Sequence, residues 1–316
     1  MYASRTKWQQ GAASVRLQLE VLEDRQTPVS HVVFSLAGGQ LSLFGDDLPN
    51  SISLTQDDTG RVTLQGFNGT LLNGQSFVDL GVVNLTRVDS AFNGGADVVV
   101  VQGLHPSQVL GVNLGSGNDT VSLTNVFASQ LVSIGGGAGF DTVIGRTVIQ
   151  TGDVVVETGN GRATIDLIGM DARGSMTLVT HEGNDLVSLQ SASVLGPLTV
   201  DTGAGNDQVV LNAVTAGTAR VASGSGHDSF FLVDFHSHLD VGITTADGDD
   251  FVWLFHTQVD RNLLVNLESG ADTLRVTGLT VGFASSFNGG SGFDTFIDEG
   301  FFTPFLDFHN FDRIFF

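Results

Sequence analysis

The sequence has no cysteine, five prolines and one lysine among its 316 residues. Without cysteine the chain has no disulfide framework and no thiolate metal site, and its redox compartment stays open. The net charge of −21 argues against nucleic acid as a partner, because phosphate contacts need clustered lysine and arginine. No run of about 18 apolar residues occurs, so we predict no membrane span.

Glycine and apolar residues are abundant instead, with 41 glycines and 41% hydrophobic residues. This apolar content argues against wholesale disorder despite the charge. Many valines, leucines, threonines and serines beside glycine indicate short strands joined by tight turns rather than helices. The acidic balance suits a cation-binding or extracellular surface protein.

An aspartate after a glycine-rich turn recurs every 22 residues, with one step of 21 between 207 and 228. We call its position the anchor of each repeat, and Ala163 occupies one of the ten anchors. The nine anchor aspartates are Asp97, Asp119, Asp141, Asp185, Asp207, Asp228, Asp250, Asp272 and Asp294. A fixed period of this length indicates a solenoid in which each repeat forms one coil.

Apolar residues form columns at fixed distances from the anchor. The residue two positions after it is apolar in all ten repeats, from Val99 to Phe296, and the residue four positions after it is apolar in eight of nine. This alternation is typical of a strand with one buried face. A later column from Val112 to Phe287 predicts a second strand, and a shorter column from Leu104 to Phe235 suggests a third.

The columns predict an all-β, right-handed parallel β-helix with 22-residue coils, because parallel crossovers are right-handed. A β-sandwich is the alternative, but it has no reason to keep so strict a period. We predict four regions: a disordered leader or export tag (1–30), irregular N-terminal coils and a cap (31–96), regular coils (97–293) and a Phe-rich C-terminal cap (294–316). That last region holds eight phenylalanines; it could pair with another chain end to end, or act as a secretion signal.

Two of the turns, residues 136–144 and 289–297, satisfy the nonapeptide GGxGxDxUx, in which U is a large apolar residue. Here the chain resembles the RTX (haemolysin-type) calcium-binding repeats. The resemblance implies Ca²⁺ as a cofactor, with the nine anchor aspartates as metal ligands. RTX repeats, however, run in tandem nines with two calcium turns in an 18-residue coil, whereas each coil here has one such turn.

The aspartate turns admit two interpretations. Calcium takes six to eight hard oxygen ligands from flexible loops, and carboxylates stacked about 4.8 Å apart repel by roughly 1 kcal/mol in water and more in the protein. Such a column should attract cations, and Arg162 beside Ala163 could replace one. Alternatively, Asp, Asn and Gly are good turn formers, and the aspartate side chains bond nearby backbone amides.

We predict no enzyme activity. Parallel β-helices often act on acidic polysaccharides, which requires a basic residue and a general base in one cleft, but the arginines fall in different columns. The best local cluster joins His236, His238 and His256 with Phe235, Trp253 and Phe255. It could form a metal or sugar platform, or an exposed aromatic ridge with incidental histidines.

Residues 16–29 resemble the "LExLExR" tag that proteins of planctomycete-like bacteria carry ahead of long repetitive surface proteins. The resemblance implies export to the cell surface or secretion; a disordered basic leader is the alternative. The sequence therefore predicts an exported, calcium-binding structural or adhesive β-helix of the bacterial surface or matrix, with polysaccharide or other surface components as possible partners. A carbohydrate-active β-helix and a calcium-independent structural solenoid are the alternatives.

Overall fold

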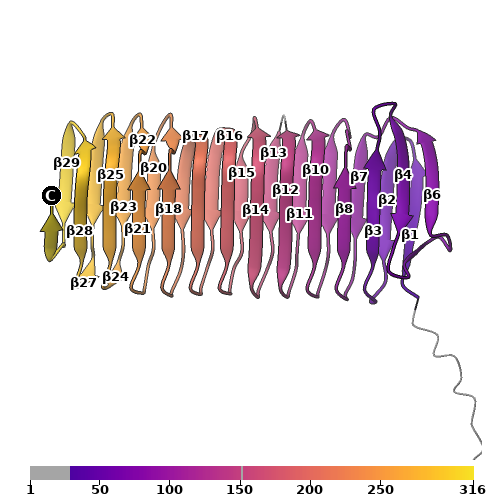
Figure 1. The fold of residues 1–316 in the computed structure, drawn as a ribbon, viewed down its shortest axis with the longest axis horizontal. Helices are drawn as coiled ribbons and strands as arrows, with labels where there is room; N and C mark the ends of the chain where they lie inside the picture. Colours follow the sequence, from indigo (N-terminus) through magenta and orange to yellow (C-terminus); the bar gives the residue numbers. More distant parts are fainter. Residues whose placement is uncertain (1–28, 151) are drawn as a thin grey trace, which may run out of the picture.

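The computed structural model describes residues 29–150 and 152–316. Within these residues the chain is all-β and winds into one right-handed solenoid whose axis lies horizontally in Figure 1. The sequence predicted this architecture, and the structure confirms it. The segment proposed as an export tag lies outside the described residues.

The strands stack in parallel, each on the equivalent strand one coil away. The first strand of each coil, on the face nearer the viewer in Figure 1, is β8 (Val98–Gln102), β10 (Thr120–Ala128), β12 (Asp141–Gln150), β14 (Ala163–Ala172), β16 (Leu186–Asp201), β17 (Gln208–Ala222), β18 (Ser229–Val233), β21 (Phe251–Phe255), β25 (Thr273–Val281) and β28 (Thr295–Phe302). The pairings Val121↔Val143 and Val143↔Ile165 show that the register follows the 22-residue period.

The opposite face carries the second strand of each coil. Its members are β9 (Val109–Asn113), β11 (Leu131–Gly135), β13 (Asp153–Glu157), β15 (Met176–Val179), the ends of β16 and β17, β20 (Val241–Thr244), β23 (Asn262–Asn266), β26 (Ala284–Asn288) and β29 (Phe305–His309). A short third strand follows the first after a bend; it is continuous with the first strand in β10, β12 and β14 and separate in β19 (His236–Ser237) and β22 (Gln258–Val259).

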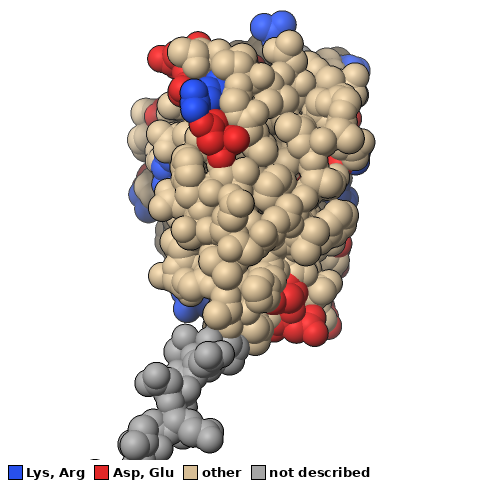
Figure 2. Space-filling view, turned by 90° about the vertical axis from the view of Figure 1, so that its right-hand side faces the viewer, with Lys and Arg blue, Asp and Glu red and all other residues tan. Residues whose placement is uncertain are grey.

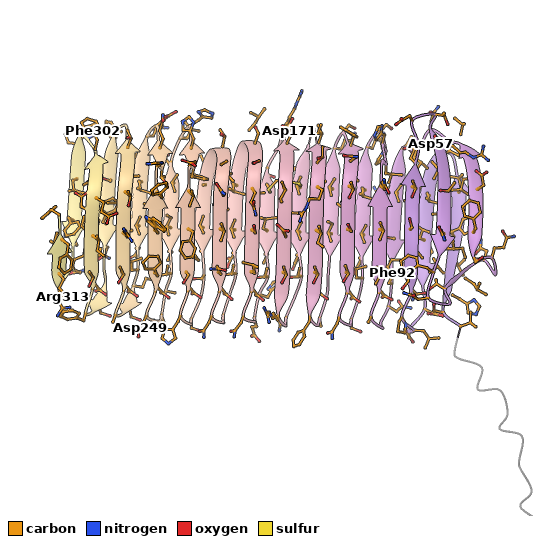
Figure 3. The ribbon with its side chains drawn as sticks, in the orientation of Figure 1. Asp57, Phe92, Asp171, Asp249, Phe302 and Arg313 are labelled. Atoms are coloured by element: carbon orange, nitrogen blue, oxygen red, sulfur yellow. The ribbon has the colours of Figure 1, made fainter. Side chains whose placement is uncertain are left out.

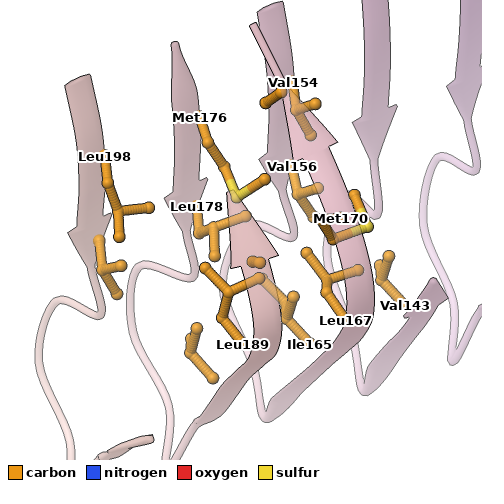
Figure 4. Packing of buried hydrophobic residues seen from close by; sticks show 14 of the residues in the cluster. Val143, Val154, Val156, Ile165, Leu167, Met170, Met176, Leu178, Leu189 and Leu198 are labelled. Atoms are coloured by element: carbon orange, nitrogen blue, oxygen red, sulfur yellow. The ribbon is translucent and has the colours of Figure 1, made fainter. Parts of the chain in front are cut away.

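The predicted apolar columns form the core between these faces. Leu167, Leu189 and Leu178 are fully or almost fully buried and pack against side chains of neighbouring coils (Figure 4). Gly145 is the exception in its column, and a Cβ there would lie 2.7 Å from Cδ2 of Leu167. Because Met170 also reaches this space, larger neighbours compensate for the missing side chain.

The single 21-residue step has a local cause. Between β16 and β17 the register shifts where Val194 pairs with Ala216 and Pro197 with Thr218. One residue, Gly217, therefore lies opposite Leu195 and Gly196. The extra Leu195 side chain is 62% exposed, so the irregularity is accommodated at the surface and the core register continues.

The N-terminal end differs from the regular coils. β3 (Ser51–Gln56) stacks on β8, which places Asn50 in the anchor column, and β2 (Gln40–Gly45) stacks on β7 (Arg87–Ala91). The remaining strands are added between and before them: β1 (His31–Ala37), β4 (Arg61–Gly66), β5 (Leu71–Leu72) and β6 (Phe77–Val82). We predicted irregular coils and a cap over 31–96, but β4 and β6 pair antiparallel with each other and β4 with β3, so this part is a set of antiparallel strands added to the stack.

Seen along the axis from this end, charged side chains gather toward the upper and lower rims, and most of the end face has none (Figure 2). At the C-terminal end the Phe-rich segment continues the stack through β28, β29 and β30 (Arg313–Phe315). The outer side of this last coil is open, and Phe302, Phe305 and Phe316 are 64%, 63% and 95% exposed.

Candidate functional site at the aspartate turns

The nine anchor aspartates lie in one line along one edge of the solenoid, the lower edge in Figure 3, where Asp249 marks the turn. Eight of them stand directly before a first strand and Asp141 begins one, and each side chain lies on the same side as the buried residue two positions later. All nine are buried, with relative exposure between 0 and 3%. The structure thus brings together every aspartate that the repeat indicated.

The backbone of the turn depends on a glycine two positions before the anchor. All ten repeats have glycine there, and its φ lies between +110° and +156° in each. In Gly205 a Cβ atom would lie 1.4 Å from the carbonyl oxygen of Gly183 in the preceding coil. Only glycine combines this backbone conformation with so close an approach of the neighbouring coil.

Each anchor carboxylate binds the backbone of the coil before it. The backbone N–H of Asp185 donates to Oδ1 of Asp207 over 2.8 Å, and that of Asp207 donates to Oδ1 of Asp228 over 2.8 Å. The same bond repeats at the other anchors, with lengths from 2.7 to 3.1 Å. The aspartates therefore form a continuous side-chain ladder that joins successive coils.

Ala163 shows what happens without the carboxylate. The N–H of Asp141, which would otherwise donate to an aspartate at 163, donates to the backbone carbonyl of Arg162 over 3.1 Å. The exposed Arg162 side chain, which we suggested as a cation substitute, lies close enough to Asp185 for its positive charge to lower the pKa of that carboxyl, against the larger rise caused by burial. The ladder resumes at once, because the N–H of Ala163 donates to Asp185.

The ladder extends beyond the aspartates that the period identified. Asn50 begins it by donating its N–H to Asp97, and Asp312 ends it by accepting the N–H of Asp294 on Oδ2 over 3.0 Å. Sequence reasoning missed Asp312 because it follows Asp294 by 18 residues. Its signal was the apolar Ile314 two positions later, which pairs with Phe296 of the preceding first strand.

A second ladder runs beside the first in the opposite direction. The residue just before the anchor accepts an N–H from the same position of the following coil: His227 donates to Oδ1 of Asn206, and Asp249 donates to Nδ1 of His227. The side-chain oxygens of Asn118, Asn184 and Asp249 likewise accept a backbone N–H from the following coil. Polar residues at this position therefore also serve the stacking.

The second oxygen of each anchor carboxylate is in a different environment. Oδ2 is buried in all nine and accepts no hydrogen bond of normal geometry. In four coils, however, a hydroxyl lies close enough to the carboxylate to lower its pKa: Thr180 beside Asp185, Thr202 beside Asp207, Ser223 beside Asp228 and Thr245 beside Asp250. Burial raises the pKa of Asp207 and Asp272 to about 7, although the accepted N–H opposes the rise. It raises the pKa of four others to about 6, namely Asp97, Asp119, Asp141 and Asp250, and also raises the pKa of Asp185, Asp228 and Asp294.

Most backbone carbonyls of the turns are engaged between coils. The carbonyl three positions before the anchor accepts an N–H from the glycine of the aspartate turn in the previous coil. An example is the carbonyl of Ser225, which accepts the N–H of Gly205 over 2.8 Å. The anchor carbonyl accepts an N–H of the next coil, as in Gln208 to Asp185 over 2.8 Å. A calcium ion here would have to draw its six to eight oxygens from the Oδ2 atoms and the remaining carbonyls, so the turns fit the ion only in part.

No family model, curated protein or solved structure matches the chain. Among the described residues there is no helix long and apolar enough to cross a membrane. The resemblance to RTX repeats and the absence of enzyme activity stay predictions.

The second surface of interest is a shallow groove of 660 Å³ on the face of β20, β23, β26 and β29. It is lined mainly by apolar and small side chains, with Arg220, Asp240 and Asp307 as its charged residues. Asp240 accepts both the backbone N–H and the side-chain amide of Asn262. Two of the other arginines are paired elsewhere, Arg146 with Asp166 and Arg275 with Glu299.

Proposed function

We propose that the protein is an elongated structural or adhesive solenoid of the bacterial surface or matrix, in which the aspartate turns hold successive coils together without an ion. The observation that carries this proposal is the unbroken succession of coil-to-coil contacts at the turn edge. From Asn50 to Asp294 every anchor N–H has an acceptor in the next coil, including the N–H of Asp141 beside the one alanine anchor. The location at the surface rests on the resemblance of residues 16–29 to an export tag.

Hydrogen bonds between successive coils stiffen the solenoid at the turn edge, where unconnected loops would be flexible. A buried backbone N–H that loses its acceptor costs about 1–3 kcal/mol, so each carboxylate resists separation of two coils. Because the contacts repeat, the whole rod resists bending at this edge. A stiff rod with variable outer faces suits a spacer or a scaffold for adhesion to polysaccharide or other surface components.

Calcium binding is the second candidate, and one observation favours it. Nine buried carboxylate oxygens without partners lie in a single line, in a chain whose acidic residues outnumber its basic ones by 34 to 13. A hard divalent cation would supply the missing charge if the turns adjusted to offer further oxygens. Calcium would then order the turn edge, as the resemblance to RTX repeats implies.

Thermal melting of the full chain in EGTA and in calcium distinguishes the two candidates. An ion that binds only the folded chain raises the midpoint by mass action. We expect the same midpoint in EGTA and in about 5 mM CaCl₂, with MgCl₂ at equal ionic strength as the control. A rise in calcium that is absent in magnesium, and that is smaller in D207N, would overturn the ion-independent ladder in favour of calcium.

A further inference from the structure

The corner opposite the aspartate turns holds a compact group of two imidazoles and a carboxylate. His236 pairs with Gln258 in the third strands of adjacent coils, and Ser237 pairs with Val259. Ser237 and Val259 point into the core and are fully buried. Strand alternation therefore turns their neighbours outward, so that His236 and His238 of one coil face Gln258 and Asp260 of the next.

The register places this group on the upper edge in Figure 3. His236 belongs to the column that also contains Asp171, Thr215 and Phe302, of which Asp171 and Phe302 are labelled there. The group thus lies across the solenoid from the anchor aspartates. It is at the surface, with His238 and Asp260 exposed and His236 half-buried.

The distances within the group match those of a metal coordination sphere. Nε2 of His236 lies 3.1 Å from each oxygen of Asp260, and Nδ1 of His238 lies 3.4 Å from Oδ2. The three ligand atoms all lie within 4.8 Å of one another. Around a tetrahedral ion with bonds of about 2.0–2.1 Å, ligand atoms are roughly 3.3 Å apart, so an ion could enter with little movement of the side chains.

Neighbouring groups orient the ligands. Gln258 donates its amide to Oδ1 of Asp260 over 2.8 Å, which fixes the carboxylate and leaves Oδ2 directed toward His238. The two imidazole rings pack edge to face with centroids 4.5 Å apart. Support of this kind from a second layer of residues holds ligand atoms in the positions that a metal requires.

We propose that His236, His238 and Asp260 form a binding site for a borderline transition-metal dication such as Zn²⁺. Imidazole nitrogen favours zinc, copper or nickel over calcium and magnesium, which prefer oxygen ligands throughout. Three protein ligands leave a fourth position open to water or to a group from another molecule. The ion would join two adjacent coils at the edge that lacks the aspartate ladder.

The third histidine of the sequence cluster is not part of this site. Nδ1 of His256 lies 3.4 Å from Oδ1 of Asp234, and its ring lies against Phe255 at a tilt of 36°, with centroids 3.9 Å apart. Phe235 is in the core. A pair such as His256 and Asp234 offers two ligands and illustrates the ordinary surface ion pair, from which the proposed site differs by its second imidazole.

Calorimetric titration of the full chain, prepared without a polyhistidine purification tag, with ZnCl₂ in the presence of excess CaCl₂ tests the proposal. We expect one saturable zinc ion per chain, and at least a tenfold weaker affinity in H238A and in D260N. H309A is the matched control, because His309 is an exposed histidine whose Nε2 lies 2.7 Å from Oδ1 of Asp307. Its affinity should equal that of the unchanged chain.

Nitrogen NMR of the imidazoles provides an independent readout. Zinc should bind Nε2 of His236 and Nδ1 of His238, which leaves the proton on Nδ1 of the former and on Nε2 of the latter. Melting curves without zinc should be the same for H238A as for the unchanged chain, since this side chain is exposed. Absence of saturable binding, an undiminished affinity in H238A, or an equal loss in H309A would each overturn the proposal.

Discussion

Two places take a positive φ in all ten coils, and the two differ in what they tolerate. Two positions before the anchor, all ten residues are glycine. Six positions after the anchor, φ is between +48° and +95° in all ten coils, but only four are glycine: Gly103, Gly169, Gly278 and Gly300. The other six are Asn125, Thr147, Ser191, Ala213, Asp234 and His256. We call the first place the aspartate bend and the second the open bend.

The difference arises from the neighbouring coil. At the open bend the conformation lies in the left-handed region that L-residues can enter at about 1–2 kcal/mol. A Cβ at Gly169 would meet nothing closer than 3.7 Å, whereas Gly103 and Gly278 have closer neighbours in Gln56 and His256. At the aspartate bend φ lies beyond that region, and the carbonyl of the preceding coil occupies the space of a Cβ. The backbone conformation and the stacking thus both require glycine at the aspartate bend.

The same substitution at the two bends should give the largest contrast. We expect G205A to lower the free energy of unfolding by more than about 3 kcal/mol, because its Cβ would overlap the carbonyl of Gly183 and separate two coils. G169A should cost only about 1–2 kcal/mol. Urea denaturation followed by circular dichroism measures both, with G242A as a control, since nothing lies within 4 Å of a Cβ there.

Similar losses for G205A and G169A would mean that the coils can shift to admit a methyl group. The explanation of the glycine column by stacking would then be wrong.

Removing one carboxylate from the aspartate bend should have an intermediate effect. D207A removes the carboxylate that accepts the N–H of Asp185, and the turn would have to shift for the carbonyl of residue 206 to replace it, as the carbonyl of Arg162 does beside Ala163. We expect a loss of about 1–3 kcal/mol. D207N keeps an acceptor at Oδ1 and removes the buried charge, so at pH 7 it should be at least as stable as the unchanged chain. Urea denaturation of both variants in EGTA measures the difference.

If D207N proved as unstable as D207A in EGTA, the charge rather than the acceptor would carry the contact. The hydrogen-bonding account of the ladder would then fail.

A further expected effect, shared by all nine anchors rather than due to one side chain, is a dependence on pH that belongs to the aspartate bend. Burial raises the pKa of six anchor aspartates to about 6 or 7 and also raises that of the other three, against about 3.9 in an unfolded chain. Between these values the folded chain binds more protons, so stability falls as pH rises from about 4 to 7. We expect melting in EGTA at pH 5 to occur at least roughly 2 °C above that at pH 7.

The double variant D207N/D272N should show a weaker pH dependence, because it removes two of the groups with the highest pKa. An unchanged pH dependence would assign it to other groups. The pKa of the exposed Asp57 and Asp79 is lowered by hydrogen bonds from Thr59 and Arg61 respectively. These two groups therefore change the stability of the fold only below about pH 4.

Much of the fold was predictable because each coil repeats the same physical requirement. The buried columns, such as Val99 to Phe296, are visible as a period, and stacking is the only way to bury them all. The N-terminal strands β4 and β6 were misread because an antiparallel hairpin has no reason to follow that period. Asp312 was missed for the related reason that the last coil is four residues shorter.

The sequence could predict which residues form the candidate sites, but not which atoms they contact. The repeat located the anchor aspartates, but not that each binds the N–H of the preceding coil, since a period contains no direction. His238 and Asp260 are 22 residues apart and could have been paired from the register. Recognising the site also required the distance from His236, which depends on how the corner bends.

The direction of the aspartate ladder has a consequence for the order in which the chain can become complete. In the regular coils most anchor N–H groups donate to a carboxylate that comes 22 residues later in the sequence. During synthesis from the N-terminus, a coil is therefore finished only when the following one has left the ribosome. The most recent coil therefore lacks an acceptor for its anchor N–H. For Asp294 this acceptor, Asp312, comes only 18 residues later.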